Sequence, residues 1–325
     1  MKKRALVAGA AGFIPSHLCD LLLDKGFDVV GIDNLVTGRM KNLESAMKRG
    51  MELIEADIRE PLPAKLKEKK FDLIFNMASP ASPIDFARIP LFILETAAKG
   101  HKNLLDLAKD HKARILFASS SEVYGDAEVH PQPETYHGNV STIGHRSCYD
   151  EAKRYGEALS VAHAKEHGTE IRIARIFNTY GPRMRPNDGR IIPNFFIQAL
   201  QGQPLSIYGD GSQTRSFCYV ADQVEGLYLL ISSNESRPVN VGNPIERSVL
   251  EIADAVNKLT GNKTPSKRLP LPEHDPKLRR PDTTRAKESV GWVPKVTLEE
   301  GLRHCHEYFK AELAASPGGI VAPTL

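Results

Sequence analysis

RALVAGAAGFIPSHLCDLLLDKGFDVVGID, residues 4–33, is the stretch that decides the fold of this chain. The segment RALVAGA is typical of a short buried strand, and leucines at helical spacing follow it until Gly26 ends the helix. The segment DVVGID is a second buried strand that ends at Asp33. Between the first strand and the helix, Gly9 and Gly12 form a turn whose backbone N–H groups can approach a phosphate.

Asp33 follows this turn by about 20 residues, which makes the pattern that of a dinucleotide-binding unit rather than a simple strand–helix turn. A carboxylate at this place accepts hydrogen bonds from both ribose hydroxyls of adenosine and repels a 2′-phosphate. We therefore expect NAD, not NADP, as the cofactor. The residues that we expect to contact it are Gly9, Gly12, Phe13, Ile14, Asp33, Asn34, Asp57, Ile58, Ala78, Tyr149 and Lys153.

Pro15 stands where a third glycine would complete the pattern. That glycine normally serves the close packing of helix on strand more than contact with phosphate. Proline is tolerated in the first turn of a helix, because the N–H groups there have no partner within the helix. We expect the nucleotide site to persist.

Four more segments are typical of buried strands, and helical segments separate them: ELIEADI, FDLIFNMAS, ARILFASSSEVYG and EIRIARIFNTYGP. This alternation predicts an α/β fold with a doubly wound parallel sheet of the Rossmann type. Ligands bind at the carboxyl edge of such sheets. Six residues at predicted strand ends should gather there: Gly9, Asp33, Asp57, Ala78, Ser120 and Asn178.

The amino-acid composition and the pattern of predicted elements change after about residue 180. Gly, Pro and Arg become frequent there, and the strand and helix segments become shorter. We expect residues 1–180 to form the NAD-binding domain. Residues 181–325 would form a smaller, interleaved substrate-binding domain, from which a segment near 217–243 returns to the sheet.

Composition excludes several classes of partner and site. The 43 basic and 40 acidic residues nearly balance, and no apolar run approaches the ~18 residues that span a bilayer, so we expect neither a nucleic-acid nor a membrane partner. The cysteines are scattered without a CxxC pair, which favours free thiols in the cytoplasm. Two histidine pairs lack a full ligand set, so we expect no metal. They are His163 with His167, and His304 with His306.

The segment SCYDEAKR places Tyr149 and Lys153 four residues apart, on one face of a predicted helix. A lysine cation near a tyrosine favours the phenolate and lowers its pKa, which suits a base at neutral pH. Ser120, at the end of the serine-rich strand, can hydrogen-bond a reacting hydroxyl or ketone. Together with the nucleotide pattern, these residues predict redox chemistry on an alcohol.

With these residues in place, nearly the whole chain resembles extended short-chain dehydrogenases/reductases that act on nucleotide sugars, and in particular UDP-glucuronate decarboxylases (UDP-xylose synthases). The stretches that carry the resemblance are NMASPASP, SSSEVYGDAEVHPQPE, GNVSTIGHRSCYDEAKR, RIARIFNTYGPRM, NDGRIIPNF, GDGSQTRSF and DPKLRRPD.

The resemblance implies decarboxylation of UDP-glucuronate to UDP-xylose through a 4-keto intermediate, with NAD regenerated in each cycle. Tyr149 would take the proton of the sugar C4 hydroxyl while Ser120 polarises that group. Ser121, Glu122 and Arg279 would act on the C5 side. The resemblance further implies a homodimer, and contacts to the UDP-sugar from Asn178, Arg190, Tyr208, Arg215 and Arg279.

Three other functions stay open: a UDP-sugar or UDP-uronate 4-epimerase, a sugar-nucleotide 4,6-dehydratase, and an NAD-binding regulator without activity. Ser121 stands where dehydratases carry the aspartate of an Asp–Glu pair, which argues against dehydration. The Ser120, Tyr149 and Lys153 set argues against a pure regulator. The chain departs from the family pattern at Ala97, His137, Ser141 and Thr142; the last three lie in a loop that we expect near the substrate.

Overall fold

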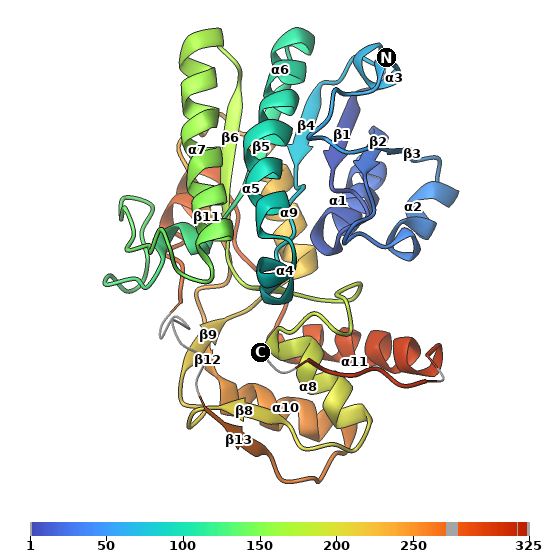
Figure 1. Cartoon of the computed structure of the whole chain (residues 1–325), viewed down its shortest axis with the longest axis vertical. Helices are drawn as coiled ribbons and strands as arrows, with labels where there is room; N and C mark the ends of the chain where they lie inside the picture. Colours follow the sequence, from blue (N-terminus) through green and yellow to red (C-terminus); the bar gives the residue numbers. More distant parts are fainter. Residues whose placement is uncertain (1, 271–278, 317, 324–325) are drawn as a thin grey trace.

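The computed structural model describes residues 2–270, 279–316 and 318–323. At its centre lies a seven-stranded sheet in which every neighbouring pair is parallel (Figure 1). In spatial order the strands are β11 (Val239–Val241), β6 (Ile171–Ile176), β5 (Arg114–Ser120), β4 (Leu73–Asn76), β1 (Arg4–Ala8), β2 (Asp28–Asp33) and β3 (Glu52–Glu55). The strand order reverses between β1 and β4, which confirms the predicted doubly wound sheet and places its binding crevice beside β1.

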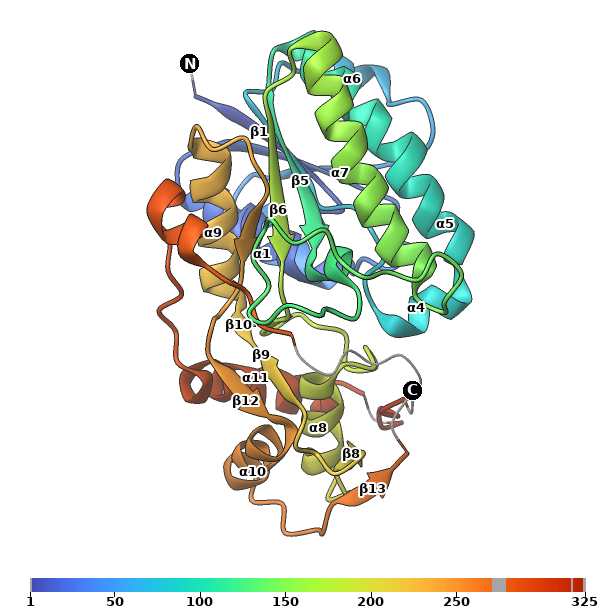
Figure 2. The ribbon, with the colours of Figure 1, turned by 90° about the vertical axis from the view of Figure 1, so that its left-hand side faces the viewer.

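Helices cover both faces of this sheet, as Figure 2 shows. One face carries α1 (Phe13–Asp24) and α9 (Val220–Ser232), and the other carries α5 (Pro90–Glu95), α6 (His101–His111) and α7 (Ser147–His167). Because both faces are covered, the inner strands are largely buried; Ala5 to Ala8 of β1, for example, are all fully buried.

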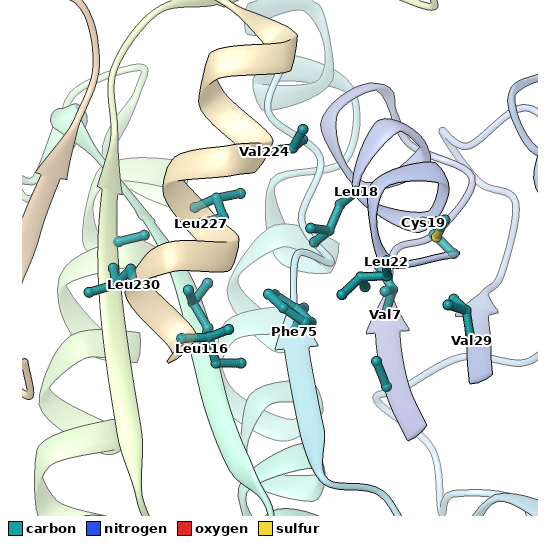
Figure 3. Packing of buried hydrophobic residues seen from close by; sticks show 14 of the residues in the cluster. Val7, Leu18, Cys19, Leu22, Val29, Phe75, Leu116, Val224, Leu227 and Leu230 are labelled. Carbon is teal, nitrogen blue, oxygen red and sulfur yellow. The ribbon is translucent and has the colours of Figure 1, made fainter. Parts of the chain in front are cut away.

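The core on the α1 and α9 face is packed from leucine side chains of both helices and from Val224 of α9 (Figure 3). They meet apolar side chains of β1, β4 and β5, and the labelled contacts come from Leu18, Leu22, Val224, Leu227, Leu230, Val7, Phe75 and Leu116. Cys19 lies in the same core, and all four cysteines of the chain are free and buried.

The sequence predicts a helix over residues 92–111, and the structure confirms it, because the chain is helical without a break from Pro90 to His111. A π-helical turn, Thr96–Gly100, separates α5 from α6. This turn lies where the chain passes Ile58, since a Cβ on Gly100 would come within 2.7 Å of the Ile58 side chain. Glycine therefore allows a close approach to the strand-end loop that lines the nucleotide site.

A second body of shorter elements lies beyond the carboxyl edge of the sheet (Figure 1). Its helices are α8 (Ile191–Leu200), α10 (Val249–Thr260) and α11 (Leu298–Ala314), which share one hydrophobic core. Its strand pairs are β8 (Ser206–Tyr208) with β13 (Lys267–Leu269) and β9 (Thr214–Ser216) with β12 (Glu246–Ser248).

Other short elements of the chain are β7 (Thr179–Tyr180), β10 (Cys218–Tyr219), α2 (Glu44–Lys48), α3 (Ala64–Lys67) and α4 (Pro83–Arg88).

We propose the division into residues 1–180 and 181–325, with 217–243 returning to the first domain. The packing of α9 and β11 with the large sheet supports it. Trp292, beyond that segment, also joins this core and donates a hydrogen bond to the Asp222 carbonyl at 3.0 Å. In the described part of the chain, no helix combines the length and hydrophobicity needed to cross a bilayer.

Candidate active site

A cavity of about 800 Å³ opens at the carboxyl edge of the sheet, between the sheet and the second body. All six residues at predicted strand ends line it, and so does every other residue that the sequence assigns to the cofactor, to catalysis or to the substrate. The parallel topology explains this gathering, because it brings all strand ends to one edge. The chemical role of each residue stays a prediction.

The glycine turn at one end of the cavity is built for close approach. Gly9 has a φ of +75°, and a Cβ there would lie 2.8 Å from the Ala78 Cα. Gly12 precedes the first residue of α1, and Pro15 lies in the first turn of that helix without interrupting it. A Cβ on Gly12 would meet the Pro15 ring at 3.1 Å, so proline and glycine pack tightly together.

Carboxylates at the next two strand ends face the same part of the cavity. Asp33 accepts hydrogen bonds from the N–H groups of Ala11 at 2.9 Å and Leu35 at 2.7 Å. Burial raises the pKa of Asp33, and these N–H groups oppose that rise. The Asp57 carboxylate accepts from Asn34 Nδ2 at 2.9 Å. A tight glycine turn at a helix N-terminus, with a carboxylate at the end of β2, fits the pyrophosphate and adenosine ribose of NAD.

Tyr149 and Lys153 lie on α7 in the middle of the cavity wall, and both side chains are buried. Lys153 Nζ is 5.4 Å from the centre of the Tyr149 ring and donates a hydrogen bond to the Ala118 carbonyl at 2.8 Å. Phe86 stacks on the other side of the Tyr149 ring with 4.8 Å between ring centres. Ser120 lines the same part of the cavity and acts on the pKa of the Tyr149 hydroxyl, so the three residues form one group.

The electrostatics of this group differ from the sequence expectation. Burial raises the pKa of Tyr149 to about 12, although the Ser120 hydroxyl opposes the rise. Burial also lowers the pKa of Lys153 to about 7. Both groups lie in low dielectric, so each favours its neutral form, and desolvation outweighs the attraction that a fixed lysine charge would give.

Glu122 lies in a 3₁₀ turn, Ser121–Tyr124, directly after β5. Its Oε2 is 2.7 Å from Arg146 Nη2 and 3.5 Å from Arg279 Nη2. Burial alone would raise the pKa of Glu122, but the two arginines outweigh burial and lower it to about 2. Glu122 is therefore a fixed carboxylate at neutral pH.

The Arg279 side chain is almost fully buried beside this turn. It donates hydrogen bonds to the carbonyls of Ser121 and Gly125, the latter at 2.9 Å. The structure thus brings Ser121, Glu122 and Arg279 together. Residues 275–278, the first half of the DPKLRRPD motif, lie outside the described residues.

The substrate-side residues come from the second body and from the loops that join it to the sheet. Asn178 follows β6, Tyr208 ends β8 and Arg215 is the central residue of β9. Arg190 is held in a two-pronged contact by the Asp188 carboxylate, with 2.9 Å between Nη2 and Oδ2. The positive charge of Arg190 is therefore already partly balanced by Asp188, and the sequence did not predict this ion pair.

Two further contacts join the walls of the cavity. Arg185 Nη2 lies 2.6 Å from Oδ2 of the buried Asp85, and Ser82 Oγ donates to the Asp188 carbonyl at 2.6 Å. Sequence reasoning missed both contacts, because about 100 residues separate the partners and no local pattern links them. It also missed Arg146, which a simple signal could have found, since Arg146 precedes Tyr149 by three residues at the start of a predicted helix.

The departures from the family pattern fall in two places. Ala97 is buried in the cluster that contains Phe86 and Tyr149. His137, Ser141 and Thr142 are exposed and are not among the residues that line the cavity. His145 and Arg146, at the end of the same loop, line the cavity. That His137, Ser141 and Thr142 lie near the substrate stays a prediction.

Comparisons with known proteins agree with this arrangement. The model of the NAD dependent epimerase/dehydratase family matches residues 5–242. UDP-glucuronic acid decarboxylase 1 of Danio rerio is 49% identical over 313 residues, which are 96% of this chain and 74% of that protein. UDP-glucuronic acid decarboxylase 3 of Arabidopsis thaliana is 47% identical over 312 residues, 95% of this chain and 90% of that protein.

Two solved structures share the fold over almost their whole length. UDP-glucose 4-epimerase of Thermotoga maritima, with UDP-glucose, has a TM-score of 0.87 and 30% identity and covers 95% of this chain and 99% of its own. UDP-glucuronic acid 4-epimerase of Bacillus cereus, with UDP-glucuronic acid and NAD, has a TM-score of 0.85 and 28% identity with the same coverage. On these matches, the chain belongs to the NAD-dependent epimerase/dehydratase family.

Proposed function

We propose that this chain is an NAD-dependent UDP-glucuronate decarboxylase that releases CO2 and forms UDP-xylose. The observation that carries the proposal is identity of 47–49% with UDP-glucuronic acid decarboxylases over 95–96% of the chain. Its cavity supports the same conclusion, because a group suited to alcohol oxidation lies beside a buried carboxylate with two arginines.

NAD, when bound, supplies an acceptor for the hydride of the sugar C4 carbon and gives that hydride back at the end of the cycle. The glycine turn with Gly9 and Gly12 would hold its pyrophosphate at the N-terminus of α1. Asp33 would hold the adenosine ribose, and the remaining cofactor-side residues would line its path: Phe13, Ile14, Asn34, Asp57, Ile58 and Ala78.

Tyr149 would take the proton of the C4 hydroxyl and return it later. Its pKa of about 12 keeps the phenol protonated unless a nearby positive charge favours the phenolate. Lys153 is placed to supply that charge, since its pKa of about 7 lets it bind a proton near neutral pH. Ser120, which lines the cavity with Tyr149, would polarise the C4 oxygen during the same transfer.

Oxidation at C4 makes the sugar a β-keto acid, so the bond between C5 and its carboxylate can break while the ketone takes the electron pair. Glu122 is ionised and cannot donate the proton that C5 then needs. Its role would be to hold Arg146 and Arg279 in place. Arg279 would pair with the sugar carboxylate beside Ser121 or donate the proton to C5. Among the described residues, its buried Nε has no hydrogen-bond partner.

The UDP moiety would extend toward the second body, where Asn178, Arg190, Tyr208 and Arg215 line the cavity. Arginine forms charge-assisted hydrogen bonds with diphosphate oxygens. Arg215 and Arg190, whose charge Asp188 shares, would both contact the diphosphate.

We also propose a homodimer and a cytoplasmic location. Leu91 and Leu94 on α5 and Tyr155 and Val161 on α7 are exposed, although α5 and α7 pack side by side. A second copy of this apolar face would cover it. The four free, buried cysteines favour a reducing compartment.

The test is to incubate the purified protein with UDP-glucuronate and no added cofactor, and to follow CO2 and the sugar product by mass. We expect CO2 and a UDP-pentose, with NAD carried by the protein. A product of unchanged mass would instead identify a 4-epimerase, the function of the solved structures named above. A product lighter by one water would identify a dehydratase.

A further inference from the structure

The loop that follows β2, residues 34–43, lies directly over the carboxylate that we assign to the adenosine ribose. A Cβ on Gly38 would come within 2.9 Å of Asp33 Oδ1. The next residue, Arg39, donates its backbone N–H to the Ala11 carbonyl at 3.0 Å, and Ala11 in turn donates its N–H to Asp33. The Arg39 side chain therefore starts beside the ribose carboxylate and is long enough to turn toward it.

The structure turns this side chain the other way, toward the C-terminal helix α11. Arg39 Nη2 lies 2.7 Å from Glu312 Oε2, and Nη1 donates to the Tyr308 hydroxyl at 3.2 Å. Lys41 Nζ lies 2.8 Å from the other oxygen of Glu312. The loop NLVTGRMKNL contains two cations, and one carboxylate holds both.

Glu312 is well placed for this task, because its side chain is only 5% exposed. A buried carboxylate held by two cations is costly to break, since removal of one partner leaves a charge without compensation. Arg39 and Lys41 are thus restrained at the edge of the nucleotide site by a residue that is far from them in the sequence.

We propose that Glu312 is a selectivity residue for the cofactor: by holding Arg39, it withholds the cation that a 2′-phosphate would need at the ribose edge. In dinucleotide-binding units an arginine near this edge accommodates the 2′-phosphate of NADP. NADP is then disfavoured in two independent ways, by repulsion from Asp33 and by the engagement of Arg39 with α11.

The proposal predicts a coupling that a double-mutant comparison measures. Each protein is equilibrated with an excess of NAD and NADP in equal amounts, freed of unbound nucleotide and denatured, and the bound nucleotides are quantified by chromatography. We expect Asp33→Ser alone to raise the ratio of NADP to NAD modestly. Asp33→Ser with Glu312→Gln should raise it roughly tenfold further, because the released arginine forms charge-assisted hydrogen bonds to phosphate.

Two controls separate selectivity from mere support of the loop. Adding Arg39→Gln to the double variant should abolish the gain. Lys41→Gln in the Asp33→Ser background is the matched control, because it removes one ion pair of the same carboxylate but leaves Arg39 bound to Glu312; its ratio should stay near that of Asp33→Ser. If Glu312→Gln gives too little folded protein, Glu312→Asp should give a smaller gain in the same direction.

A purely structural role for Glu312 would weaken binding of both nucleotides alike and leave their ratio unchanged. An unchanged ratio in the folded double variant, or a gain that survives Arg39→Gln, would overturn the proposal. Neither result bears on which sugar nucleotide the protein acts on, since the assay contains none.

Discussion

Replacing Glu122 by glutamine removes the buried carboxylate that Arg146 and Arg279 share, and the structure sets the size of the effect. The pKa of Glu122 is lowered from 4.5 to about 2. Each pKa unit corresponds to about 1.4 kcal/mol, so ionisation of this group adds roughly 3 kcal/mol to the free energy of unfolding at neutral pH. We expect Glu122→Gln to cost about that much, since it leaves the buried Arg279 and the partly exposed Arg146 less well compensated.

The pH dependence follows from the direction of this shift. Because the pKa of Glu122 is lower in the folded state, its contribution is complete well above pH 4.5 and is lost as the pH falls toward about 2. The difference between the native protein and Glu122→Gln should therefore shrink to roughly 2 kcal/mol near about pH 3.5.

Urea unfolding followed by circular dichroism, at neutral pH and at about pH 3.5, measures this difference directly. Glu95→Gln is the matched control, because Glu95 also has a lowered pKa, through its hydrogen bond with Lys99, but its side chain is 43% exposed. Solvent screening should leave that variant near the stability of the native protein. Equal unfolding midpoints for the two variants at neutral pH would refute the reasoning.

Three further outcomes are expected. Tyr149→Phe should lower kcat by about 100- to 10,000-fold while UDP-glucuronate still binds. Tyr155→Phe, at an exposed position on the same helix, should leave kcat unchanged. Steady-state kinetics measure kcat, and calorimetry measures the binding of UDP-glucuronate. Gly9→Ala should lower the melting temperature and the amount of bound NAD more than Gly26→Ala, because both glycines have positive φ but only Gly9 has neighbours within 4 Å. If the proposed dimer forms, Leu91→Glu, at a position 74% exposed on α5, should leave the protein folded but monomeric in light scattering.

The parts of the site that could be predicted from the sequence are those that one strand, one turn or one helix builds. Gly9 and Asp33 belong to one strand–helix–strand unit, and Tyr149 and Lys153 to neighbouring turns of one helix. The parallel sheet brings the carboxyl ends of its strands to one edge, so the sequence also predicts that these residues line one cavity.

The parts that could not be predicted depend on packing between distant segments. Arg39 and Glu312 are 273 residues apart, and only the position of α11 against the nucleotide loop makes them partners. The raised pKa of Tyr149 also depends on packing between distant segments. The sequence shows that Lys153 is near Tyr149, but it does not show how deeply the surrounding chain buries both side chains. Asp188 lies two residues before Arg190, yet nothing in the sequence indicates that it shares the arginine's charge.

Because every native thiol is buried, this protein can be labelled selectively at a cysteine introduced on its surface. Burial raises the pKa of Cys19, Cys148, Cys218 and Cys305, and maleimide reagents attack the thiolate. A cysteine introduced at Ile143, which is 94% exposed, would therefore react far ahead of the native four. A fluorophore attached there would report on the loop that precedes α7 in the otherwise unmodified chain.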